Sequence, residues 1–263
     1  MHAFQPIAVP CEAARYGAAI LYLPDLWVDA RAWRGWAGFL GHRGWEGWLV
    51  PLRELDGGIE ARAAVVAEFV RGLPAPPVLL GDGAGGAVAA SVARQVPVAA
   101  VVLLAPFVPG VSALGTLLAR WDALWPLLTN GRVPPPSGAV LAGLRAPTAR
   151  GVKDDDCGLS AESASVLLDL ARARVAPAAL AVRSVVLSGD GDQFTPAEAA
   201  RGLARTLGAD FELLPGRPHW LRAHPDWQRT AGWVHRWLVR GLDADLLEFY
   251  AEAMADRDAD DPE

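Results

Sequence analysis

One stretch, residues 77–89, constrains the fold of this chain more than any other. It begins with the apolar run Pro77-Val78-Leu79-Leu80, continues through Gly81-Asp82-Gly83-Ala84-Gly85-Gly86 and ends in Ala87-Val88-Ala89. This pattern predicts a strand, a sharp glycine turn and a helix. Small residues at such a turn let the two backbones pass close together. A glycine-rich connection without further role would look the same, so the rest of the chain decides between the two interpretations.

Strand-like and helix-like segments alternate along most of the chain. This alternation predicts a mostly parallel sheet with helices on both faces, and ligand sites in such α/β sheets lie beyond the carboxyl ends of the strands. Strands are predicted at 4–9 (an edge strand), 18–23, 45–52, 77–81, 98–104, 183–189 and 210–214, and helices at 30–40, 59–73, 84–94, 196–207 and 227–239.

The pattern changes between residues 108 and 181, where no strand-like run occurs. We predict a helix at 114–128, a proline-rich loop, and a second helix that begins at Ser160 as its N-cap. We interpret this segment as a helical lid inserted over the strand ends. The chain then divides into two parts of one core, 1–107 and 182–240, the lid 108–181, and an acidic tail, 241–263, that holds a short helix near its start.

Composition narrows the classes of partner. A net charge of -6 argues against nucleic acid, and no apolar run is long enough for a membrane span. We see no signal peptide, and Cys11 and Cys157 fit no metal or redox spacing, so we expect a cytoplasmic protein without metal or cofactor. We expect a monomer or a small homo-oligomer.

The turn at Gly81-Asp82-Gly83-Ala84-Gly85-Gly86 resembles the nucleophile elbow of the α/β-hydrolase family, Gly-x-Ser-x-Gly-Gly. Gly83 stands where that motif has its serine, so no acyl-enzyme can form at this position. The resemblance implies an α/β-hydrolase fold with a lid. It also implies that the N–H of Ala84, at the start of a helix, serves as a donor to an oxyanion.

Two further segments resemble this family, in its chain order. Gly189-Asp190-Gly191-Asp192-Gln193-Phe194-Thr195-Pro196 resembles the turn that carries the acid, which implies that Asp192 is the acid; otherwise Asp192 is an ordinary turn or capping residue. Leu214-Pro215-Gly216-Arg217-Pro218-His219 resembles the loop that carries the histidine, which implies that Asp192 orients His219. His224 is the rival, but it lacks the Pro-Gly-x-x-His context.

Pro24-Asp25 is a second departure, because the family has His-Gly near its oxyanion hole. The backbone N–H of Leu26 or Trp27 could still donate alongside Ala84. A carboxylate at Asp25 would oppose a developing oxyanion, unless it is only a solvated loop residue or a helix cap. Asp82, one residue before the missing serine, points elsewhere and is not expected to replace it.

The chain contains 11 tryptophans, an unusual number for its length. Some are expected near the mouth of the site or on the lid, where they would line a site for a small to medium apolar ligand. Core packing is the alternative for each of them. The candidates for the site are Trp27, Trp121, Trp125 and Trp220, and those for helix-face core are Trp33, Trp36, Trp233 and Trp237.

Three functions remain open from the sequence. The first is an enzyme in which a His219–Asp192 dyad acts as general base without a covalent step, as a hydrolase, lyase or cofactor-free catalyst. The second is a non-catalytic binding or scaffold protein, a pseudoenzyme that keeps the fold and pocket. The third is a serine esterase whose nucleophile was replaced by Gly83 through engineering. The identity of the substrate is open in each case.

Overall fold

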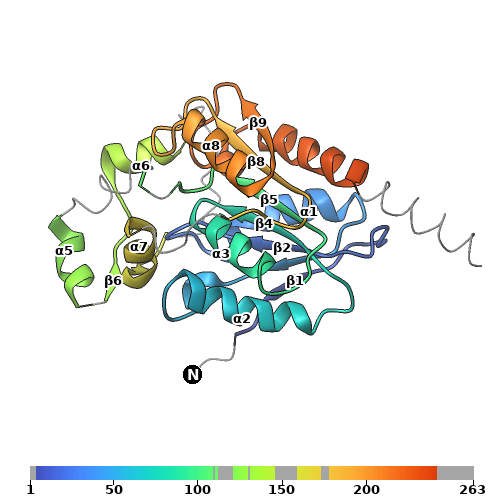
Figure 1. Ribbon diagram of the computed structural model, residues 1–263, viewed down its shortest axis with the longest axis horizontal. Helices are drawn as coiled ribbons and strands as arrows, with labels where there is room; N and C mark the ends of the chain where they lie inside the picture. The colour runs from blue at the N-terminus through green and yellow to red at the C-terminus, as the bar shows by residue number, and fades with distance from the viewer. Residues whose placement is uncertain are drawn as a thin grey trace, which may run out of the picture.

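A computed structural model describes residues 4–108, 110–111, 121–129, 131–145, 159–172 and 178–241. Its centre is a seven-stranded sheet in the order β1-β3-β2-β4-β5-β8-β9 (Figure 1). Only β1, at one edge, is antiparallel to its neighbour, and the other strand pairs are parallel. The strands are β1 (Ile7–Val9), β2 (Ile20–Leu23), β3 (Gly47–Leu49), β4 (Val78–Asp82), β5 (Ala100–Leu104), β8 (Ser184–Gly189) and β9 (Asp210–Leu214). The predicted α/β class and its mostly parallel sheet are confirmed.

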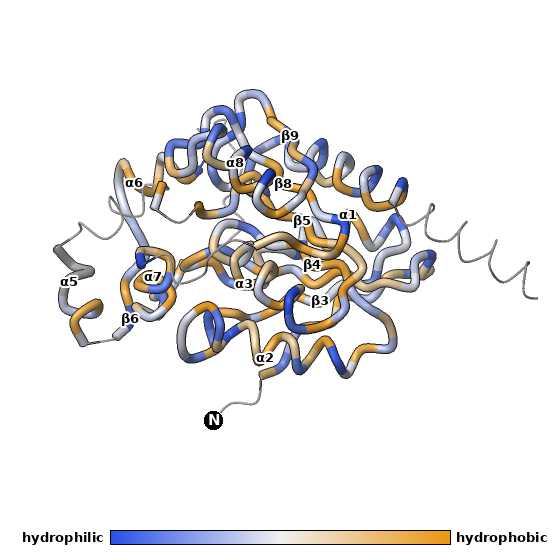
Figure 2. The backbone as a smooth tube through the Cα atoms, viewed as in Figure 1, coloured by the Kyte–Doolittle hydropathy of each residue, from blue (hydrophilic) through white to orange (hydrophobic). Residues whose placement is uncertain are grey.

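Helices cover both faces of the sheet because the strands are apolar on both faces. Along β2, Leu21 and Leu23 pack into one core cluster, and Ile20 and Tyr22 into the other. Figure 2 shows these central strands as the most hydrophobic part of the chain. The helices of the first face are α2 (Ile59–Arg71), α3 (Ala84–Ala93) and α8 (Ala197–Leu207), and those of the second are α1 (Arg34–Gly41) and the helix at 227–241. A short 3-10 helix, Ala30–Trp33, leads into α1 and is capped by the Asp29 side chain.

The segment expected to be a lid gathers at one end of the molecule (Figure 1). Its described helices are α5 (Trp121–Leu128), α6 (Gly138–Leu144) and α7 (Ala164–Ala171). The expectation that it holds no strand is wrong, because β6 (Arg132–Val133) pairs antiparallel with β7 (Glu162–Ser163). Ser160 is not the cap of the following helix either. Ser163 caps α7, because its hydroxyl accepts a bond from the N–H of Ser165 at 3.3 Å.

This segment is bound to the core by buried polar contacts. Arg62 on α2 and Glu162 on β7 form an ion pair at 2.6 Å, and both side chains are almost completely buried. On the same side of the core, the Asp169 carboxylate of α7 accepts a bond from the N–H of Ile59 at 3.0 Å. The Trp27 indole donates to the carbonyl of Val133 at 3.0 Å. The position of the segment is therefore tied to α2 and to the loop after β2.

Removing one partner of the Arg62–Glu162 pair should destabilise the fold strongly. Glu162→Met leaves the Arg62 guanidinium buried without its counter-charge, and we expect a loss of about 3 kcal/mol or more in the free energy of unfolding. The double variant Arg62→Met with Glu162→Met removes both charges and should recover most of that loss. Urea denaturation of the three proteins measures it. A double variant as unstable as the single one would contradict the expectation.

Several sequence predictions lie outside the described residues. These are the first part of the helix at 114–128, the acidic run at 154–156, Cys157, and the tail with its short helix. Cys11 is a free thiol. Among the described residues, no group of three or more potential ligands could hold a metal ion, and no helix is long and apolar enough to cross a membrane.

Candidate functional site

The turn between β4 and α3 has the backbone of a sharp strand-to-helix elbow. Gly83 occupies it with φ 51° and ψ -115°, a conformation that residues with a side chain rarely adopt. The two backbones approach so closely that a Cβ at Gly85 would lie 2.6 Å from the carbonyl oxygen of Pro24. The sequence therefore needs small residues around Gly83 because β4, α3 and the end of β2 meet there.

The carboxylate of Asp25 fills the space in front of Gly83. A Cβ at residue 83 would come within 2.6 Å of the Cγ and both carboxylate oxygens of Asp25. The side chain of a serine at this position would therefore overlap Asp25. Asp25 is only 4% exposed, so the interpretation of a solvated loop residue is wrong.

Asp25 is held in this position by groups around the elbow. Its Oδ1 accepts a bond from the N–H of Ala84 at 2.8 Å, and its Oδ2 accepts a bond from the Trp220 indole at 2.8 Å. The Nε2 of His219 lies 3.6 Å from Oδ2. Ala84 is the residue whose N–H was expected to serve an oxyanion, and here that N–H binds a carboxylate of the protein itself.

Asp192 and His219 lie in direct contact. The Asp192 Oδ2 is 2.8 Å from the Nδ1 of His219, and both side chains are fully buried. The other carboxylate oxygen, Oδ1, accepts bonds from the N–H groups of Phe194 at 2.7 Å and Thr195 at 2.9 Å. Asp192 is thus both a turn-capping residue and the partner of His219, so the two interpretations from the sequence are compatible.

The surroundings of His219 favour its charged form. Burial alone would lower the pKa of the imidazole, but the hydrogen bond to Asp192 and the negative charges of Asp192 and Asp25 outweigh it and raise the pKa to about 10. His219 therefore carries a proton on each ring nitrogen at neutral pH. It lies between two carboxylates, one at Nδ1 and one near Nε2.

A second buried ion pair lies beside the elbow. Arg222 Nε is 3.1 Å from Asp82 Oδ2, and Asp82 is completely buried. Burial raises the pKa of Asp82 to about 7, although the charge of Arg222 opposes the rise. No feature of the sequence indicates this partner of Asp82.

Aromatic rings close the site around His219. Phe107 and Phe194 lie on its ring at centroid distances of 5.1 and 5.6 Å, and the imidazole has no exposed surface. The guanidinium of Arg222 lies 5.5 Å from the Trp220 ring centroid. The Trp220 backbone N–H also donates to the carbonyl of Leu144 in α6 at 2.9 Å, so the segment between β5 and β8 reaches the site.

Of the remaining candidates, Leu26 lies beside this cluster, where it lines a small cavity together with Asp25 and Ala84. Leu26 and Trp27 are buried in the loop after β2, and the Trp27 indole donates to the carbonyl of Val133 in β6. Trp125 on α5 is 73% exposed, and the side chain of Trp121 lies outside the described part of the chain. His224 contacts the guanidinium of Arg217 and does not reach Asp192, so the structure selects His219 over its rival as the partner of that carboxylate.

Solved structures of lipases resemble the whole described architecture. The match to a monoacylglycerol lipase from Paleococcus ferrophilus covers 90% of this chain and 99% of the lipase, with a TM-score of 0.70 and 17% identity. A soluble variant of the Saccharomyces cerevisiae monoglyceride lipase matches 90% of this chain and 92% of its own, with a TM-score of 0.72 and 13% identity. The chain has the α/β-hydrolase fold. MenH from S. aureus shares this fold over 92% of the chain and all of its own length, with a TM-score of 0.66 and 13% identity.

Sequence comparison adds nothing to this result, since no protein-family model and no curated protein matches the chain. At these identities the likeness establishes the α/β-hydrolase fold alone. The chemistry of the site has to be argued from its own residues.

Sequence reasoning missed the way in which Asp25 enters the elbow. The available signal was the coincidence of two departures, a glycine at residue 83 and an aspartate at residue 25. Taken together, the two departures indicate that the side chain missing at residue 83 is replaced in space by the side chain at residue 25. The Asp82–Arg222 and Arg62–Glu162 pairs gave no such signal, because their partners are about 100 or more residues apart in sequence.

Proposed function

We propose that this chain is a non-hydrolytic protein of the α/β-hydrolase fold that binds a small to medium apolar ligand. The observation that carries the proposal is Asp25. Its carboxylate fills the space of a serine side chain and occupies the N–H of Ala84. Neither a nucleophile nor a free oxyanion donor at Ala84 is then present at the elbow.

The protonation of His219 supports this proposal over a dyad enzyme. A general base has to accept a proton at its operating pH. With a pKa raised to about 10, His219 already holds that proton at neutral pH. Its Nε2 faces Asp25 Oδ2 at 3.6 Å, and its ring is fully buried.

The fit between Asp25 and Gly83 supports a natural site over an engineered one. An esterase that lost its serine by one replacement would keep an empty space in front of residue 83. Here the carboxylate of Asp25 fills that space and has two hydrogen-bond donors of its own. The absent side chain of Gly83 and the position of the Asp25 carboxylate are complementary, as in a site in which both residues changed together.

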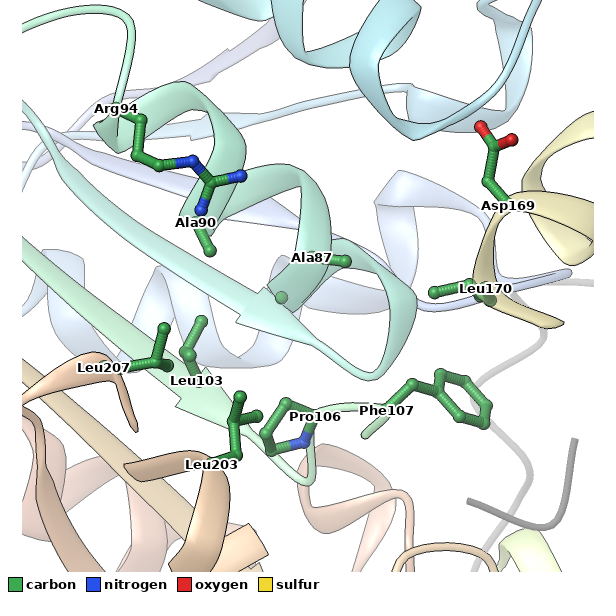
Figure 3. A pocket seen from close by; sticks show the side chains of 11 residues that line it. Ala87, Ala90, Arg94, Leu103, Pro106, Phe107, Asp169, Leu170, Leu203 and Leu207 are labelled. Carbon is green, nitrogen blue, oxygen red and sulfur yellow. The ribbon is translucent and has the colours of Figure 1, made fainter. Parts of the chain in front are cut away.

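An apolar cleft between α3, the end of β5, α7 and α8 supports ligand binding. It offers about 470 Å³ of space, including the part open to solvent. Figure 3 shows Arg94 and Asp169 at its two ends, with apolar side chains between them. The lining consists of Gly86, Ala87, Ala90, Leu103, Pro106, Phe107, Leu170, Leu203 and Leu207 in addition to those two. Such a surface suits an apolar ligand with a small polar end.

The cytoplasmic location and the monomeric or small homo-oligomeric state remain predictions.

Narrowing this cleft should weaken binding of an apolar probe. Ala90→Leu adds a larger side chain to the cleft wall and so takes space from the ligand. We expect the affinity for 1-anilinonaphthalene-8-sulfonate to fall about tenfold, because the lost apolar contact corresponds to roughly 1.4 kcal/mol of binding free energy. Fluorescence titration measures the affinity. Ala64→Leu is the matched control, since Ala64 is exposed on α2 away from the cleft.

Two outcomes would overturn the proposal. Equal affinities of the Ala90→Leu and Ala64→Leu proteins would remove the cleft as the binding site. Ester hydrolysis by the unmodified chain that disappears in His219→Ala would show that the site turns over substrate.

A further inference from the structure

Three N–H groups converge on one point at the elbow. The first is the N–H of Ala84 at the start of α3, where the helix dipole favours negative charge. The second is the indole of Trp220. The third is the Nε2 of His219, which carries a proton and has no hydrogen-bond partner among the residues that the structure describes. Ala84 lies at the start of α3, whereas His219 and Trp220 are neighbours in the loop after β9, and all three residues are buried.

The chemistry of this arrangement is specific for a carboxylate. Ala84 and Trp220 each address a different oxygen of Asp25, both at 2.8 Å. The imidazolium supplies a positive charge 3.6 Å from the second oxygen. Two separated acceptor oxygens and one negative charge are what this set of donors requires.

We propose that Ala84, Trp220 and His219 form a carboxylate-binding site, that Asp25 is its built-in occupant, and that a small free monocarboxylate of acetate size takes this place when the Asp25 side chain is removed. This inference goes beyond the proposed apolar-ligand function and does not depend on it. In the native chain the tethered carboxylate has the advantage of a high local concentration over any free one.

The loop that carries Asp25 is fixed from outside the site. Trp27 has a φ of 63°, its indole donates to Val133 at 3.0 Å, and its carbonyl accepts a bond from the N–H of Ser160 at 3.0 Å. Both partners belong to the lid segment. The segment thus holds Asp25 in the carboxylate site as an internal blocking group.

Chemical rescue of Asp25→Gly tests the proposal. The substitution deletes the atoms of one acetate ion and leaves the three donors in place. We expect acetate to raise the melting temperature of Asp25→Gly in a saturable way, by about 5 °C or more at saturating concentration, relative to chloride at equal ionic strength. The native protein, whose site is filled by Asp25, should show no saturable rise. Acetamide, which has the shape of acetate without its charge, should not replace it.

Two variants serve as controls for this rescue. Asp25→Gly with Trp220→Phe lacks one donor, and its apparent affinity for acetate should be at least about tenfold weaker than that of Asp25→Gly. Asp29→Gly removes a different aspartate near the same loop, the cap of the 3-10 helix, and should not respond to acetate.

The result that overturns the proposal is an Asp25→Gly protein that acetate stabilises no more than chloride does. If Asp25→Gly does not fold in chloride, refolding in acetate becomes the measurement, with Asp25→Asn as the reference that keeps the shape of the side chain. Recovery of the fold in acetate alone supports the site, and failure in both salts while Asp25→Asn folds overturns it. Neither result depends on probe binding in the apolar cleft, so this inference and the proposed function fail separately.

Discussion

Esterase activity is expected to appear when Asp25→Gly and Gly83→Ser are combined in one chain. The first change empties the space in front of the elbow and frees the N–H of Ala84 and the Nε2 of His219. The second places a hydroxyl in that space, beside an imidazole that Asp192 still orients. Loss of one of the two carboxylates also brings the pKa of His219 closer to neutral pH, where it can act as a base.

The size of this effect follows from the cost of losing a nucleophile. Removing the serine of an assembled triad costs on the order of a million-fold in turnover. Even an imperfect reassembly should therefore raise the hydrolysis of short activated esters by about a hundredfold or more over the unmodified chain. Steady-state rates on a panel of p-nitrophenyl esters measure it.

The single variants are the decisive controls. Gly83→Ser alone should stay close to the background rate, because its side chain would overlap the Asp25 carboxylate. Asp25→Gly alone has no nucleophile and should also stay there. Adding His219→Ala to the double variant should remove the gain. A Gly83→Ser protein as active as the double variant would show that Asp25 does not block the elbow.

The fold could be predicted because its signals are local. The central strands β2 and β5 are continuous apolar runs, and the glycines around Gly83 reflect a close approach that the chain makes within a few residues. The association of Asp192 with His219 was predictable for a different reason. Both residues follow strands, β8 and β9, that are neighbours in the sheet.

The rest of the site depends on contacts that the sequence does not encode locally. Asp25 reaches the elbow because the following loop has an unusual backbone at Trp27, with φ 63°, and that backbone is fixed by contacts with a segment more than 100 residues away. A tryptophan with positive φ has no local sequence signal. The strands β6 and β7 were not predicted, because each has only two residues and is too short to show a strand pattern in the sequence.

The stability of the protein is expected to fall steeply between about pH 7 and pH 10. The groups that face His219 are the carboxylates of Asp25 and Asp192 beside its ring and, one shell further out, the Asp82–Arg222 pair. Its pKa is raised from 6.5 to about 10 in the folded protein. The contribution of the charged His219 ring to the free energy of unfolding is therefore complete below pH 6.5, decreases as the pH rises, and is lost above about pH 10.

The expected loss is large because the shift is large. Three pH units at 1.36 kcal/mol each give roughly 4 kcal/mol in the free energy of unfolding between pH 7 and pH 10. The pKa of Asp82 is raised to about 7, so the stability that this group contributes is lost as the pH rises to 7. Asp82 therefore adds little to the fall in stability between pH 7 and pH 10. Urea denaturation at a series of pH values measures the slope, and the NMR signal of the His219 ring gives its titration directly.

A neutral replacement of Asp192 separates this cause from general alkaline destabilisation. Asp192→Asn keeps the shape of the side chain but removes a charge that raises the pKa of His219 in the folded protein. The fall in stability should therefore still begin near pH 6.5, but it should end at a lower pH and be smaller. Asp56→Asn, at an exposed position, is the matched control and should leave the profile where it is. If the Asp192→Asn profile coincides with that of Asp56→Asn, the imidazolium between two carboxylates is not what stabilises the site. In that case Asp25 would be held at the elbow by the N–H groups of Ala84 and Trp220 alone.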